Sequence, residues 1–259
     1  MKHQQHVTYL ILLLFVLANV FGLWVAHYYT TNALPFGIER LSDEGLFSLS
    51  TFLFALLAMT LVILVLIRYK KILLWKIMYG VGIGLAMAIT LNIFFGETGL
   101  LVAGFLLLLK LRSHDAYFHN ITEILIYGGV VAIIAPMFNP TTAVLLLAIV
   151  SLYDTYAVRV SKHMVTLAKA QSTAGVFPGI IVEQKNSASF LGGGDIAFPL
   201  LLASVFAGTS LITSAFIIGG AANGLLFLLT RGKKGTYYPA MPFISVGAML
   251  GMIVSIAFV

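Results

Sequence analysis

The sequence predicts an all-α, polytopic membrane protein with nine transmembrane helices, its N-terminus in the cytoplasm and its C-terminus outside. Three observations predict this class: the composition, the series of apolar segments and the placement of the basic residues. The chain has 259 residues, of which 60% are hydrophobic and 9% are charged, whereas soluble domains carry about 25% charged residues. Because so apolar a chain cannot bury its hydrophobic surface within itself, lipid is its predicted solvent. Cysteine is absent, which excludes disulfides, thiol nucleophiles and thiolate metal sites.

Nine apolar segments predict the helices, and all but the short fourth one approach the length of about 20 residues that crosses a bilayer. In chain order they are 7–28, 46–67, 74–94, 98–111, 119–138, 141–159, 191–208, 210–229 and 240–258. No small-residue cleavage site follows the first, so we expect a retained helix rather than a signal peptide. The chain then divides into helices one to six (1–159), a cytoplasmic loop (160–190) and helices seven to nine (191–259).

The basic residues predict the orientation of these helices. Of the 15 lysines and arginines, only Arg40 lies in a connection on the far side from the N-terminus. Basic residues collect on the cytoplasmic side of membrane proteins, which places the N-terminus inside. The net charge of +6 is scattered over many loops rather than gathered on one face, so we expect no nucleic-acid partner.

Two carboxylates lie inside the predicted spans, where each costs roughly 2.5–3.5 kcal/mol on insertion scales. Asp154 lies thirteen residues beyond Thr141, at the outer end of span six, and Asp195 lies fourteen residues before Thr209, at the outer end of span seven. At 1.5 Å per residue both are about 20 Å from the outer surface. If spans six and seven are neighbours, the two side chains can meet at one depth.

Two carboxylates in contact at low dielectric do not both ionise cheaply, so one keeps its proton and the pair titrates as a unit. Such a pair suits amide hydrolysis, in which the ionised member takes a proton from water and the protonated member polarises the carbonyl. This chemistry needs neither a metal nor a cofactor. By themselves the residues leave two alternatives open: a pair that only joins two helices, and the coupling site of a proton-coupled transporter.

Glycines and prolines accompany the two aspartates. Three glycines (192–194) precede Asp195, and without side chains they let another backbone approach closely. Span nine opens on Pro239 and Pro242, which interrupt the regular hydrogen-bond ladder and favour extended backbone. Extended backbone at membrane depth is tolerated where it is buried in protein or lines a wet cavity.

These residues resemble the motifs of a known family. They are Tyr153-Asp154, Gly192-Gly193-Gly194-Asp195 and Pro239-Ala240-Met241-Pro242. They look like the YD, GxGD and PAL motifs of the presenilin and signal-peptide-peptidase intramembrane aspartyl proteases, in the same order and on spans six, seven and nine. The resemblance covers the whole chain and implies an aspartic endopeptidase that cuts transmembrane segments of substrate proteins within the lipid bilayer, with no cofactor.

The same resemblance implies the site residues. The implied catalytic pair is Asp154 and Asp195, and the implied substrate-binding residues are Tyr153, Gly192, Gly193, Gly194, Pro239, Ala240, Met241 and Pro242. Met241 stands where the family usually has leucine, which is similar in volume. The cytoplasmic N-terminus favours a presenilin-like protein, most like a microbial homologue in the cell membrane. Prepilin peptidases, which also carry a GxGD aspartate, are the nearest enzymatic alternative, and homo-oligomerisation stays open.

Three further features carry expectations. Part of the long loop, from the apolar run 175–182 and from 187–191, is predicted to form strands that pair with an unwound substrate; an amphipathic covering loop is the alternative. Glu123 lies one turn into span five, where a helix N-terminus stabilises a negative charge, and this interpretation is favoured over a catalytic role. Glycine pairs at helix-packing spacing predict close helix contacts: 80 and 84, 220 and 224, 247 and 251.

Overall fold

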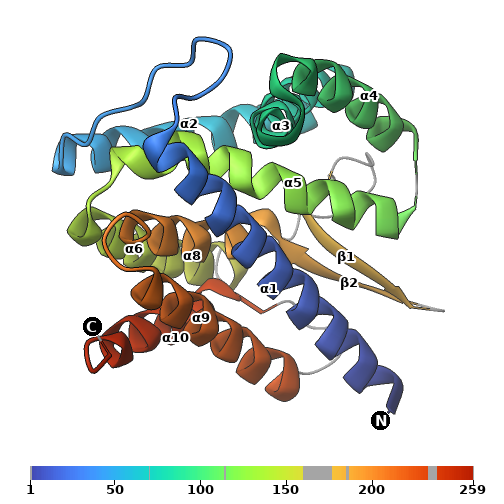
Figure 1. Ribbon diagram of the computed structural model, residues 1–259. Helices are drawn as coiled ribbons and strands as arrows, with labels where there is room; N and C mark the ends of the chain where they lie inside the picture. The colour runs from blue at the N-terminus through green and yellow to red at the C-terminus, as the bar shows by residue number, and fades with distance from the viewer. Residues whose placement is uncertain are drawn as a thin grey trace.

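The computed structural model describes residues 2–69, 71–113, 115–159, 177–184, 187–232 and 238–258. Most of this chain is helical, as expected, and the elements follow one another in the order shown in Figure 1. They are α1 (Lys2–Thr31), α2 (Leu46–Arg68), α3 (Ile72–Phe95), the 3-10 turn η1 (Gly96–Thr98), α4 (Gly99–Arg112), α5 (Ala116–Ile134), η2 (Ala135–Met137), α6 (Pro140–Arg159), β1 (Gly179–Gln184), β2 (Ser187–Gly192), α8 (Gly193–Phe206), α9 (Leu211–Arg231) and α10 (Met241–Ser255).

The helices identify an integral membrane protein. Within the described ranges, six helical stretches are long and apolar enough to cross a membrane, and one of these, Leu73–Arg112, contains both α3 and α4. Two shorter apolar helices, α8 and α10, accompany them. The stretch 73–112 is not one straight rod, because Gly96 has a positive φ of 58° and α3 and α4 pack against each other.

Polar side chains fix where several helices begin. Asp115 precedes α5, and its carboxylate accepts a hydrogen bond from the Phe118 N–H at 2.8 Å. Ser210 precedes α9 and accepts from the Thr213 N–H at 3.1 Å. Each side chain satisfies an amide that the helix leaves without a partner, which is the usual role of aspartate and serine at this position.

Helix α1 occupies the centre of the bundle. It packs against α5, α8 and α9, and Figure 1 shows it crossing the molecule between α5 on one side and the pair α9 and α10 on the other. The buried residues of α1, α5, α6, α8, α9, α10 and the two strands form one continuous core. A second core cluster joins α3 to α4 and α5. The fold thereby places α6, α8 and α10 beside one another.

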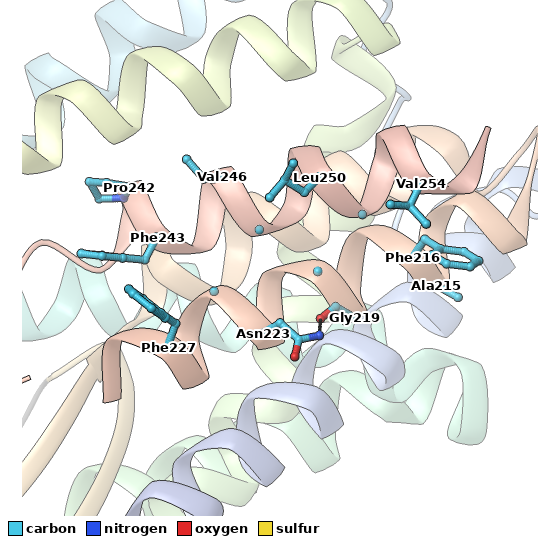
Figure 2. Close-up of a pocket in the computed structure, with 14 residues that line it drawn as sticks. Ala215, Phe216, Gly219, Asn223, Phe227, Pro242, Phe243, Val246, Leu250 and Val254 are labelled. Carbon is cyan, nitrogen blue, oxygen red and sulfur yellow. Dashed lines mark hydrogen bonds between the residues drawn. The ribbon is translucent and has the colours of Figure 1, made fainter. Parts of the chain in front are cut away.

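Helices α9 and α10 pack with their backbones in very close approach. A Cβ added to Gly220 would lie 2.1 Å from the carbonyl oxygen of Gly247, and one added to Gly224 would lie 2.1 Å from that of Phe243. On the outer side of this contact runs a groove of about 1040 Å³, lined by apolar side chains and glycines of both helices. Figure 2 shows Phe227 and Phe243 at one end of the groove and Asn223 beside Gly219, whose carbonyl it binds at 2.8 Å.

The long loop contains the strands expected there and corrects one boundary of the expected fold. Strands β1 and β2 form an antiparallel hairpin in which Gly179 lies opposite Gly192, within a chain that is otherwise helical. Span seven begins at Gly193 rather than at residue 191, because Leu191 and Gly192 belong to β2. The expected strand from 175–182 is found from Gly179 onward; residues 175 and 176, like the rest of 160–176, lie outside the described residues.

Candidate active site

Asp154 lies in the last two turns of α6 and faces the start of α10. Its carboxylate oxygen Oδ2 accepts a hydrogen bond from the Met241 N–H at 3.2 Å, and the Ala240 N–H donates to the same carboxylate. Met241 is the first residue of α10, where amides have no partner within the helix. The amides without an intrahelical partner and the helix dipole make this a favourable place for a carboxylate.

Asp195 is the third residue of α8. Its side chain turns back toward the residue that precedes the helix, and the Gly192 N–H donates to its carboxylate. This reach from the third helical position to the N-cap amide is one half of a capping box, which glutamate or glutamine usually supplies. Both aspartates are partly buried. Each carboxylate is held by backbone amides at the start of a helix.

The fold places the two aspartates on neighbouring helices. Helices α6 and α8 pack together, and α10 packs against both. Asp154 lies near enough to Asp195 for its charge to act on that carboxylate. That the two acids share one proton and act on a water molecule stays a prediction from the sequence.

The three glycines next to Asp195 have different surroundings. A Cβ on Gly192 would lie 3.2 Å from Oδ2 of Asp195, and one on Gly193 would lie 3.3 Å from both the Pro178 carbonyl and the Tyr127 hydroxyl. Gly194 is exposed, and its nearest neighbour would be the Phe198 ring at 3.4 Å. Part of the predicted clearance is therefore used by the protein itself, and the open side is at Gly194.

The remaining candidate residues are dispersed around the pair. Tyr153 is hydrogen-bonded with Thr60 of α2, so it connects α6 to α2. Pro239 and Ala240 are buried before α10, next to the amides that hold Asp154. Pro242 lines the outer groove between α9 and α10, as Figure 2 shows. Neither aspartate lines that groove, and the described residues contain no cluster of three histidines or acids that would hold a metal ion.

Side chains of α5 fix the hairpin beside the aspartates. Asn120 accepts from the Ile181 N–H at 2.9 Å and donates to the Ile181 carbonyl at 2.7 Å. The backbone of Gly179 is held in the same way, with its N–H donating to Glu123 at 3.1 Å and its carbonyl 2.8 Å from Nε2 of His119. These contacts occupy the outer edge of β1, which leaves β2 on the opposite edge of the hairpin (Figure 1).

Sequence reasoning did not find the role of Glu123. Its side chain is buried, 3.0 Å from the ammonium of Lys110, and bonds to a strand 56 residues away. The expected role at the start of a helix is therefore only part of its environment. The available signal was a basic residue at the end of span four facing an acid near the start of span five, two helices joined by a short turn.

Known structures share this architecture. A presenilin family intramembrane aspartate protease solved in space group C222 superposes with a TM-score of 0.72 at 21% identity, covering 97% of this chain and 99% of that one. A presenilin family intramembrane aspartate protease solved in space group P2 gives a TM-score of 0.70 at 22% identity, with 96% and 97% covered. No protein-family model and no curated protein matches the chain. The chain thus has the fold of these proteases over nearly its whole length.

Proposed function

We propose that this protein is an intramembrane aspartyl protease of the presenilin type, most like a microbial homologue, with Asp154 and Asp195 as its catalytic pair. One observation carries the proposal: within a fold shared with presenilin family proteases, the two aspartates lie on helices that pack together, near enough for the charge of one to act on the other. A carboxylate inside a membrane protein is costly, so two of them on neighbouring helices indicate a function.

The proposed reaction is hydrolysis of a peptide bond by water. One carboxylate is ionised and removes a proton from water as its oxygen attacks the carbonyl carbon, and the other donates its proton to the carbonyl oxygen. The tetrahedral intermediate then breaks its C–N bond, the amine leaves with a proton from the pair, and a carboxylic acid and an amine result. The amides of Ala240 and Met241 orient Asp154 throughout.

We further propose that the substrate reaches the pair as an extended strand along β2. Ile181 directs its N–H and carbonyl to Asn120, so its pairing with Phe190 is of the non-hydrogen-bonded kind. The N–H and carbonyl of Phe190 therefore point to the other edge of the hairpin. Among the described residues, none makes a hydrogen bond to them, and such an edge is suited to strand addition.

The proposed topology has nine spans, with the N-terminus inside and the C-terminus outside. Helices α3 and α4 pack against each other on either side of the break at Gly96, which supports two separate crossings. Helices α8 and α10 are short but apolar, and the extended strand β2 leads directly into α8. Extended backbone at that depth is acceptable here because it adjoins the polar site.

Proteoliposomes that contain the purified protein and a single-span transmembrane peptide test the proposal. We expect the wild type to cut the peptide within its apolar segment, and we expect Asp154→Ala and Asp195→Ala each to abolish cleavage while the protein still melts cooperatively. Peptide that stays intact with wild-type protein, together with proton-driven solute uptake that both substitutions abolish, would show a transporter instead.

A further inference from the structure

A buried ion pair lies between α4 and α5, close to the aspartates but not in contact with them. The ammonium of Lys110 is 3.0 Å from Oε1 of Glu123, and the two side chains are only 4% and 2% exposed. Lys110 also donates to the Thr122 hydroxyl at 2.7 Å and lies 3.2 Å from Nδ1 of His119. Charges are retained in such a place when their remaining hydrogen bonds are satisfied.

Both carboxylate oxygens of Glu123 are fully used. Oε1 accepts from Lys110 and from the Tyr79 hydroxyl at 3.3 Å. Oε2 accepts from the Tyr127 hydroxyl at 2.9 Å and from the Gly179 N–H at 3.1 Å. Three helices, α3, α4 and α5, thereby determine the position of one carboxylate, and that carboxylate holds the first residue of β1.

His119 forms a second hydrogen bond from α5 to the backbone of Gly179. Because the lysine ammonium is a donor only, Nδ1 of His119 accepts its hydrogen bond, and Nε2 then carries the ring proton. Nε2 lies 2.8 Å from the Gly179 carbonyl, to which it donates. Gly179 itself has a φ of +147° and leaves no room for a Cβ, which would be 2.2 Å from the Leu191 carbonyl.

The peptide group between Pro178 and Gly179 connects Glu123 to the start of α8. The peptide between Pro178 and Gly179 donates its N–H to Glu123 and accepts at its carbonyl from the Gly193 N–H at 3.0 Å. Gly193 is the first residue of α8 and lies two positions before Asp195. The Tyr127 hydroxyl, which also bonds Glu123, packs directly against Gly193.

We propose that Glu123 is a positioning residue that sets the place of Asp195 through the Pro178–Gly179 peptide and Gly193. The inference rests on the proposed function for its effect on catalysis. Glu123 acts here as a hydrogen-bond acceptor for Gly179, and Lys110 makes its buried charge acceptable. Turnover therefore depends on an acceptor at position 123, and it does not depend on the negative charge once Lys110 is also neutral.

Two double variants of the full-length protein separate these roles. Lys110→Met with Glu123→Gln removes both charges but keeps an acceptor for the Gly179 N–H, whereas Lys110→Met with Glu123→Met removes the acceptor at nearly the same side-chain length. We expect kcat of the Gln variant to stay near wild type and kcat of the Met variant to fall roughly 10-fold or more, because small misplacements of catalytic groups are costly. KM should stay near wild type in the Gln variant and rise in the Met variant, because β2, the proposed docking edge for the peptide, lies within the loosened segment.

Amide hydrogen exchange of the segment 187–198 provides a measurement that does not need activity. We expect faster exchange in the Met variant than in the Gln variant, at matched melting temperatures, because opening follows the loss of local contacts. Equal kcat and equal exchange in the two variants would overturn the inference. A wild type that cuts no peptide would refute the proposed function alone, and the exchange comparison would still decide the role of Glu123.

Discussion

At the scale of single residues, backbone amides hold the two aspartates. Asp154 accepts from the amides at the start of α10, and Asp195 accepts from Gly192 just before α8. Both are places where a helix presents unpaired N–H groups and a partial positive charge. In the described part of the chain, the donors to the two acids are backbone amides, which suits the proposed sharing of a proton.

Phe190 provides the residue-scale prediction. Because its N–H points away from β1, Phe190→Pro should remove a donor for the incoming strand without breaking the β1–β2 ladder, and proline is tolerated at such an edge. We expect kcat/KM for a transmembrane peptide to fall by roughly 10-fold, the value of about 1.4 kcal/mol for one hydrogen bond. The measurement is steady-state cleavage in proteoliposomes.

Phe190→Leu is the matched control, since it changes the ring and keeps the N–H. This control should retain most of the wild-type kcat/KM. Equal rates for the proline and leucine variants would contradict strand addition at β2 and would favour the alternative in which the loop only covers the site.

At the scale of elements, glycines determine how α9 and α10 meet. Gly220 and Gly247 face each other so closely that each would place a Cβ against the other's carbonyl, at 2.1 and 2.2 Å. This is the close contact that the spacing predicts for 220 and 224 with 247 and 251. The pair at 80 and 84 instead faces Leu107 of α4, with a Cβ 3.9 and 3.1 Å away, which is a looser contact than expected.

Neighbouring glycines of α9 test this contact. Gly220→Ala forces two backbones apart and should lower the free energy of unfolding by about 1–3 kcal/mol. Gly219→Ala meets nothing within 4 Å and should be neutral or raise it by up to about 1 kcal/mol, since alanine favours a helix. Unfolding by SDS in mixed micelles measures both. Equal stability of the two variants would show that α9 and α10 are not packed through Gly220.

The sequence allowed prediction of what depends on apolar length and local motif. The helices and a strand in the long loop follow from such signals, and the structure has them. The equal depth of the two aspartates follows from the same signals and stays a prediction. The contacts of Glu123 with Lys110 and Gly179 could not be predicted, because they depend on how α4, α5 and β1 meet. The end of β2 at Gly192 likewise depends on its pairing with Gly179, which no local signal reveals.

At the scale of the whole molecule, the topology decides which side of the membrane the hairpin faces. The described helices include six stretches of spanning length and two shorter apolar ones, and the proposed nine spans count α3 and α4 separately and include α8 and α10. Two loops separated by an even number of crossings lie on the same side of the membrane. Two loops separated by an odd number lie on opposite sides. The count is therefore open to direct measurement.

Single cysteines report these sides cleanly because the chain has none of its own. Ser42, Ser113 and Thr209 are exposed and are separated by three proposed spans each. We expect an impermeant thiol reagent to label Ser42→Cys and Thr209→Cys on intact cells and Ser113→Cys only after lysis. Labelling of Ser42→Cys and Ser113→Cys from the same side would show that α3 and α4 make one crossing together.

The most direct measurement of the account compares peptide turnover by Asp154→Asn, Asp195→Asn and the double variant. Groups that act as one unit lose nearly all activity when either is removed, and removing the second costs little more. We predict that each single substitution lowers kcat by at least about 10³-fold and that the double variant is no slower than the singles. Substantial turnover in either single variant, or losses that add up in the double, would contradict an acid pair working together on water.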